Sequence, residues 1–299
     1  MRTVEKAVSV VLCVILFFAT LYTGISVSLK MTVFDKNFYV KNVITDEYIK
    51  SLRLYISDII YKQLLLYETD PQKVSEKITE DELRQLSEEN IFSAVNSVLK
   101  GVDYEIARYE NPDIRAGIEQ ELQSFAEEND LKVADGVVDE IYLSVCNTVS
   151  FNTAVFSKSM VEKVPDISGY VKIFDYWYLG FVVFVLCISG IIFLNRKRLF
   201  SGLYSLFTSI WLGSAVCFIP MAMLSLYDLP SRLSLSDGPM RLFMEATVYG
   251  TQNIFLWVFG TVFVFACIGL GLSIFVFVRR HNKEKKASDR YFAEVDEQA

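Results

Sequence analysis

Residues 7–29 read AVSVVLCVILFFATLYTGISVSL, a run of 23 apolar or small side chains without a charge. About 20 such residues in a helix cross the roughly 30 Å hydrocarbon core of a bilayer. Three later runs reach that length, at residues 173–194, 202–226 and 254–278. Because lipid offers the backbone no hydrogen-bond partner, each run is predicted to be helical. The first stretch therefore predicts one of four transmembrane helices.

The segment between the first two runs has the opposite character. Residues 30–172 hold 16 Lys and Arg residues against 26 Asp and Glu residues, a net charge of −10. Such a charge repels polyanions, so a nucleic-acid partner is not expected. The charge favours cationic, zwitterionic or protein partners. The chain is thus expected to be an all-α membrane protein, with four transmembrane helices and a helical-bundle extracytoplasmic domain inserted between the first and second.

Basic residues predict the orientation. They fall in residues 1–6, in the loop 195–201 and in the charged tail 279–299, whereas the short loop 227–253 holds only Arg232 and Arg241. Cytoplasmic loops carry the excess of Lys and Arg, so both termini are expected in the cytoplasm and residues 30–172 outside a cell membrane. The first run is longer than a secretory signal and lacks a small-residue cleavage site, so it is expected to stay as an anchor. Residues 30–172 hold no glycosylation sequon, which favours a bacterial membrane.

Apolar residues recur every three or four positions within 30–172, which predicts helices. Four faces are expected. They comprise Ile49, Leu52, Ile56, Ile59 and Leu66; Ile91, Phe92, Val95, Val98 and Leu99; Ile114, Ile118, Leu122 and Phe125; and Val138, Ile141, Val145 and Val149. The first helix is expected to begin near Asp46, and the last is open to extension past Phe156 to Met160.

Local signals predict where helices start and stop. Asn111 followed by Pro112 is a helix start, since the missing N–H of proline costs nothing at the first position. Asp70-Pro71 predicts a short helical turn, and Thr79 with Glu82 has the spacing of a capping box, in a separate short piece. Gly101 is expected to end the second long helix.

Small residues recur along three of the apolar runs, which favours close helix packing in lipid. They are Thr20, Gly24 and Ser28 in the first run, Ser205, Ser209, Gly213 and Cys217 in the third, and Gly269 and Ser273 in the fourth. The short link at 195–201 predicts that the second and third helices are antiparallel neighbours. Pro220 is expected to kink the third helix.

The segment 227–253 is predicted to hold a turn-rich loop, with Pro230, Ser231, Ser234, Ser236 and Asp237, followed by an amphipathic stretch. Two interpretations stay open for that stretch. It is either a separate interfacial helix, or the fourth membrane helix begins early and projects against the acidic domain; the second is favoured because only Gly250 interrupts the pattern.

No residue is predicted as catalytic, cofactor-binding or metal-binding, and no cofactor is expected. The single histidine, His281, lies in the basic tail, and no glycine-rich phosphate loop occurs. The acidic residues Glu80, Asp81, Glu82, Glu88 and Glu89 are interpreted as a solvated helix face. Cys146, the single cysteine of residues 30–172, is expected to be a small core residue, with an intermolecular disulfide as the alternative.

These observations favour a non-catalytic function. The outer domain is expected to bind a protein, an envelope component or a small ligand, as a sensor, accessory or assembly subunit, while the spans contact membrane lipids. One alternative is an enzyme acting on lipid or lipoprotein head groups through Asp175 or Glu245. A second is an oligomeric pore lined by Ser205, Thr208 and Ser209. Substitution of the two acids and conductance in reconstituted bilayers separate these classes.

Overall fold

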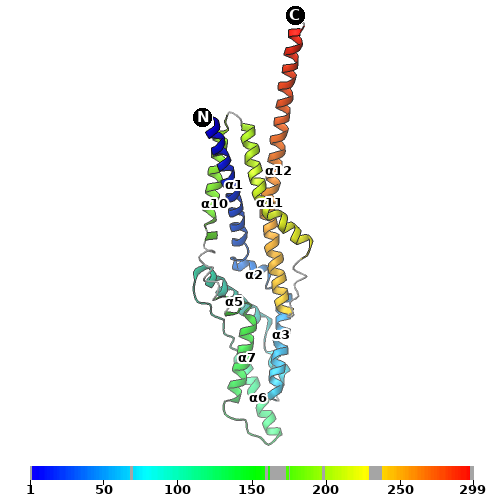
Figure 1. Cartoon of the computed structure of the whole chain (residues 1–299). Helices are drawn as coiled ribbons and strands as arrows, with labels where there is room; N and C mark the ends of the chain where they lie inside the picture. Colours follow the sequence, from blue (N-terminus) through cyan, green and yellow to red (C-terminus); the bar gives the residue numbers. More distant parts are fainter. Residues whose placement is uncertain are drawn as a thin grey trace. The chain divides into compact units, whose positions relative to one another are not determined.

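The computed structural model describes residues 2–67, 70–158, 161, 173–174, 176–196, 199–228 and 238–296. All regular elements within these ranges are helices (Figure 1). Four of them are long and apolar enough to cross a membrane: α1 (Arg2–Lys30), α10 (Trp177–Leu194), α11 (Leu199–Leu226) and α12 (Gly238–Asp296). The predicted helical character of these residues is confirmed, and the four apolar helices are consistent with a multi-pass membrane protein.

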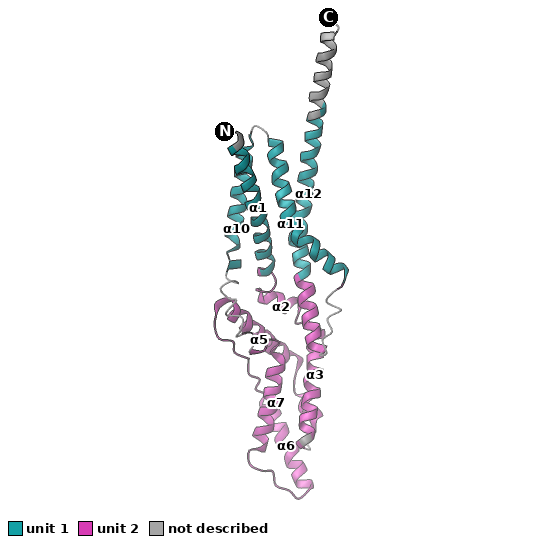
Figure 2. Ribbon diagram, viewed as in Figure 1, with its two compact units in different colours: residues 1–29, 173–227, 252–299 teal, residues 30–172, 228–251 magenta. Residues whose placement is uncertain are grey.

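The chain divides into two compact units, coloured separately in Figure 2. Unit 1 comprises residues 1–29, 173–227 and 252–299, and unit 2 comprises residues 30–172 and 228–251. Unit 1 therefore contains most of the apolar helices, and unit 2 contains the acidic segment.

In unit 1, all four apolar helices contribute to one core. Its buried side chains include Leu16 of α1, Ile191 of α10, Ile210 of α11 and Ala266 of α12. Glycines let the helices approach closely, because a methyl group on Gly24 would lie 2.5 Å from the Phe259 ring of α12.

The same arrangement recurs where Gly269 faces the ring of Phe207. At Gly213, an added methyl group would lie 3.0 Å from the backbone oxygen of Phe17. Residues from all three predicted small-residue stripes thus lie at helix contacts, which confirms their expected packing role.

Helices α10 and α11 pack against each other as antiparallel neighbours, as the short link predicted (Figure 1). Pro220 lies inside α11, and the end of that helix turns aside from the rest (Figure 1). Proline removes one backbone hydrogen bond and its ring collides with the preceding turn, so the predicted kink is confirmed.

Helix α12 is one helix of 59 residues from Gly238 to Asp296. Of the two interpretations, the structure supports the early start, and residues 238–251 belong to unit 2. Gly250 does not break the helix; a methyl group there would lie 2.7 Å from the ring of Phe38. Glycine at this position permits a close contact between helices. The predicted turn residues 230–237 lie outside the described residues.

Unit 2 contains α2 (Lys36–Asn42), α3 (Asp46–Leu64), α4 (Pro71–Glu76), α5 (Glu80–Lys100), α6 (Pro112–Glu128) and α7 (Val137–Thr153), with a 3₁₀ turn at Leu65–Tyr67. The predicted starts at Asp46, Pro71 and Pro112 are confirmed, with Thr45, Asp70 and Asn111 as side-chain caps. Gly101 ends α5 with a φ of 69°, a conformation that glycine adopts without strain.

The core of unit 2 is formed by the apolar faces of its longer helices. Helix α3 packs on α5 and α7, and α6 packs on α7. Fully or nearly fully buried side chains include Ile49, Leu52, Ile56, Ile60, Leu83, Ile91, Ile114, Ile118, Ile141, Val145 and Val149. The periodicity predicted buried positions on α3, α6 and α7, but the face predicted for α5 was wrong. Of that face only Ile91 is buried, and Phe92, Val95, Val98 and Leu99 are half-buried; the buried face of α5 includes Leu83, Leu86 and Ala94.

Several expectations about unit 2 were wrong. The capping box at Thr79 and Glu82 starts α5 itself, so the expected short piece and second helix are one helix. On α3, Ile60 is buried and Ile59 is only half-buried. The buried positions after Ile56 follow a spacing of four residues, so the next one is Ile60 and not Ile59. Helix α7 ends at Thr153 and does not run on past Phe156; Met160 lies outside the described residues. Helix α2 had not been predicted, since its 7 residues carry little periodicity.

Candidate ligand-binding groove

Unit 2 has a surface groove where α3, the end of α7 and the start of α12 meet. Its volume is about 200 Å³, and its main lining residues are Tyr48, Tyr55, Phe151, Asn152, Met240 and Phe243. We call it the aromatic groove. Cavities for drug-sized ligands are roughly 300–1,000 Å³, so this groove suits a small chemical group.

The floor of the groove is a rigid aromatic cluster. Phe243 is 1% exposed, and its ring stacks on Tyr39 with centroids 6.1 Å apart. The same ring meets Tyr48 at 6.1 Å and Phe156 at 5.8 Å. Burial raises the pKa of Tyr48 far above its ordinary value, so this hydroxyl stays protonated. The residues from α12 thus complete the core of unit 2.

The wall of the groove is open to solvent. Phe151 is 64% exposed, whereas Ile141, Val145 and Val149 of the same helix are buried. The Tyr55 hydroxyl has no hydrogen-bond partner among the described residues. Asn152 donates its side-chain amide to the Thr148 carbonyl at 2.7 Å, which leaves its side-chain oxygen available. The wall therefore offers aromatic surface and two polar atoms.

The end of α7 is fixed by buried hydrogen bonds. The Thr153 hydroxyl donates to the carbonyls of Val149 and Ser150, each at 3.0 Å, and accepts from the Asn90 amide at 3.1 Å. Ala154 then takes an extended conformation that ends the helix. The carbonyl end of α7 therefore lies beside Phe151 and Asn152, with a partial negative charge.

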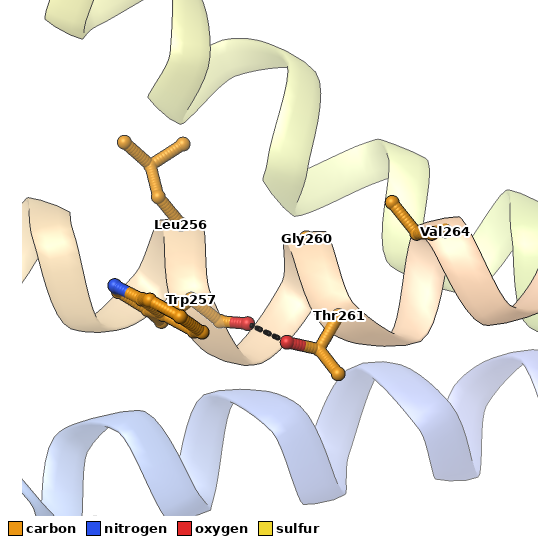
Figure 3. A pocket seen from close by; sticks show the side chains of 5 residues that line it. All are labelled: Leu256, Trp257, Gly260, Thr261 and Val264. Carbon is orange, nitrogen blue, oxygen red and sulfur yellow. Dashed lines mark hydrogen bonds between the residues drawn. The ribbon is translucent and has the colours of Figure 1, made fainter.

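A second surface depression lies in unit 1, on α12 (Figure 3). Its volume is about 450 Å³, and it is lined by Leu256, Trp257, Gly260, Thr261 and Val264. The Thr261 hydroxyl donates to the Trp257 carbonyl at 2.7 Å, the dashed line in Figure 3, so its hydrogen atom is already engaged within α12. Trp257 is 78% exposed. An open apolar surface of this kind on a span suits lipid chains.

Of the two acids of the enzymatic alternative, Glu245 lies within the described residues. The Glu245 carboxylate lies 3.7 Å from the guanidinium of Arg241, which is one turn earlier in α12. Asp175 lies outside the described residues. The ion pair gives Glu245 a structural role that needs no substrate.

The hydroxyl residues of the pore alternative bond to their own helix. Ser205, Thr208 and Ser209 each donate to the carbonyl four residues earlier, at distances from 2.8 to 3.1 Å. Ser209 is also buried. Their polar groups are therefore satisfied within α11.

The acidic cluster of α5 is divided among structural contacts. Glu82 accepts from the Thr79 backbone at 3.0 Å, from the Tyr109 hydroxyl at 3.2 Å and from the Asn111 amide at 3.1 Å. Glu80 lies 3.7 Å from Arg53. Within the described residues, no three His, Cys, Asp or Glu side chains are grouped as metal ligands would be.

Cys146 is 6% exposed, in the core of unit 2. Burial raises the pKa of its thiol, which disfavours the reactive thiolate. Its position matches the expected core residue. His281 lies on α12, but its side chain is outside the described part of the chain.

The groove was not predicted from the sequence. Phe151 lies away from the face formed by Val145 and Val149, and a large exposed aromatic residue off the core face is a usable signal of a binding surface. The remaining lining residues come from segments about 190 positions apart, so no local pattern joins them.

The described residues are all-helical, with four apolar helices consistent with a multi-pass membrane protein and a compact unit that contains the acidic segment. The chain matches no protein-family model, no curated protein and no solved structure.

Proposed function

We propose that unit 2 is a non-catalytic recognition domain on the outer face of a cell membrane. In this proposal, the chain is a four-pass sensor or accessory subunit that binds a ligand, a protein or an envelope component through the aromatic groove. The observation that carries the proposal is a wall of exposed Phe151 and half-buried Tyr55 and Asn152 over a buried aromatic floor. Rigid aromatic surface beside available polar atoms is typical of binding sites.

The continuity of α12 from the groove into an apolar helix supports a sensor. Met240 and Phe243 line the groove, and the same helix continues without a break as the fourth apolar helix. A ligand that contacts half-buried Met240, above the buried ring of Phe243, would favour one position of the start of α12. Such a ligand shifts an equilibrium only by its difference in affinity for the two positions.

Photo-crosslinking in native membranes tests the proposal. A photoreactive phenylalanine analogue at position 151 is expected to give a discrete adduct. The matched control is the same analogue at Leu143, which lies on α7 and is 57% exposed. If positions 143 and 151 give the same diffuse adducts, the groove is not a recognition site.

A further inference from the structure

The aromatic groove has a lining without charge but with several rings. None of the described residues that line it is acidic or basic. Exposed Phe151 and half-buried Tyr55 form the wall that a ligand can reach, and the buried rings of Tyr48 and Phe243 form the floor beneath it. Aromatic faces carry partial negative charge and attract cations, most strongly where water is partly excluded.

Other features of the groove favour positive charge as well. The carbonyl end of α7 carries a partial negative charge, and it is fixed beside the groove by the bonds of Thr153. The Asn152 side-chain oxygen and the Tyr55 hydroxyl oxygen are available acceptors. The basic residue beside Met240, Arg241, lies 3.7 Å from Glu245, which offsets its charge.

The charge of the whole domain acts in the same direction. Residues 30–172 carry a net charge of −10. A negative field of this kind raises the local concentration of cations and lowers that of anions.

We infer that the aromatic groove binds an alkylammonium group, either a primary amine or a methylated one. The inference rests on the proposed function and specifies the chemistry of its ligand. A volume of about 200 Å³ suits a small head group and not a nucleotide or a large cofactor. The head group belongs either to a free amine or to a phospholipid that carries choline or ethanolamine.

Equilibrium dialysis tests the inference with the full chain in nanodiscs of phosphatidylglycerol and radiolabelled choline as the probe. Saturable binding is expected, with displacement by tetramethylammonium. The neutral isostere 3,3-dimethylbutan-1-ol has the same shape without the charge, and it should bind at least about tenfold more weakly. Equal binding of the isostere, or no saturable binding of choline, would overturn the inference.

Variants locate the site. Phe151→Ala should weaken choline binding about fivefold, and because Phe151 is exposed the substitution leaves the core intact. Leu143→Ala is the matched control on the same helix and should leave binding unchanged. Unchanged binding in Phe151→Ala would place the choline elsewhere and overturn the assignment to this groove.

One further comparison distinguishes a lipid head group from a free amine as the source of the ammonium group. A second distinguishes failure of the ammonium inference from failure of the proposed recognition function. In nanodiscs of phosphatidylcholine, loss of soluble choline binding assigns the group to a lipid, and retained binding assigns it to a free amine. A discrete adduct at position 151 without choline binding would reject the ammonium ligand and keep the recognition domain. Diffuse adducts at both positions would reject the recognition domain itself.

Discussion

Phe243 is the residue on which the packing of unit 2 converges. It comes from α12, it is 1% exposed, and its ring contacts Tyr39, Tyr48 and Phe156. Phe243→Ala is expected to destabilise unit 2 by about 3–5 kcal/mol, through lost burial and the cavity left behind. Phe151→Ala removes the same atoms from an exposed position and should cost less than about 1 kcal/mol. Amide hydrogen exchange in α3 and α7 measures both, and equal losses of protection would contradict the role of Phe243.

Gly250 and Gly271 lie on the same helix but in different surroundings. A methyl group on Gly250 would lie 2.7 Å from the ring of Phe38, which is 3% exposed and has little room to move. A methyl group on Gly271 would meet nothing within 4 Å. Gly250→Ala should therefore lower thermal stability by several degrees, whereas Gly271→Ala should be tolerated. A Gly250→Ala variant as stable as the unmodified chain would exclude the close contact.

Tyr104 links the segment 101–110, which has no regular secondary structure, to the loop after α7. Its hydroxyl donates to the Phe156 carbonyl at 3.1 Å, and burial raises its pKa from 10.0 to about 12. A raised folded-state pKa favours the neutral phenol, so its stabilisation is present below about pH 10 and is lost as pH rises towards 12.

An absorbance titration of phenolate follows that group. One late-titrating tyrosine should disappear in Tyr104→Phe, and the alkaline loss of stability between about pH 10 and 12 should become smaller. If the variant instead loses a phenol that titrates near pH 10, and the late-titrating component is unchanged, Tyr104 is solvated.

At the scale of elements, the helix starts could be predicted because capping residues lie next to the helices that they cap. The caps at Asp70, Thr79 and Asn111 and the stop at Gly101 were all predicted, because each depends on residues within four positions of one another. The helix end that was not predicted from the sequence depends on a residue far away along the chain. Helix α7 stops where Thr153 bonds to Asn90 of α5. The groove was missed for the same reason, since it joins α3, α7 and α12.

The capping box of α5 allows a graded test. Thr79→Ala removes one cap and should cost about 1 kcal/mol. Glu82→Ala should cost more, because Tyr109 and Asn111 also donate to this carboxylate and would lose their acceptor. Chemical unfolding monitored by the helical signal of unit 2 compares the two variants. A smaller loss for Glu82→Ala would mean that the links to Tyr109 and Asn111 add nothing.

At the scale of the whole molecule, composition predicted the architecture more securely than the function. Four apolar runs became four long helices, because the length and hydropathy of a span are set within one segment. The acidic charge of residues 30–172 is likewise a property of one segment. Orientation and ligand depend on the membrane and on a partner, and both stay predictions.

The central claim is that unit 2 faces outward from a cell membrane that the four apolar helices span. Single cysteines at Leu131 in unit 2 and at Asn282 on α12, both exposed, test it in a background without the native cysteines. A membrane-impermeant thiol reagent added to intact cells should label position 131, and should label position 282 only after the membrane is opened. Labelling of position 282 in intact cells, with position 131 protected until the membrane is opened, would contradict the account.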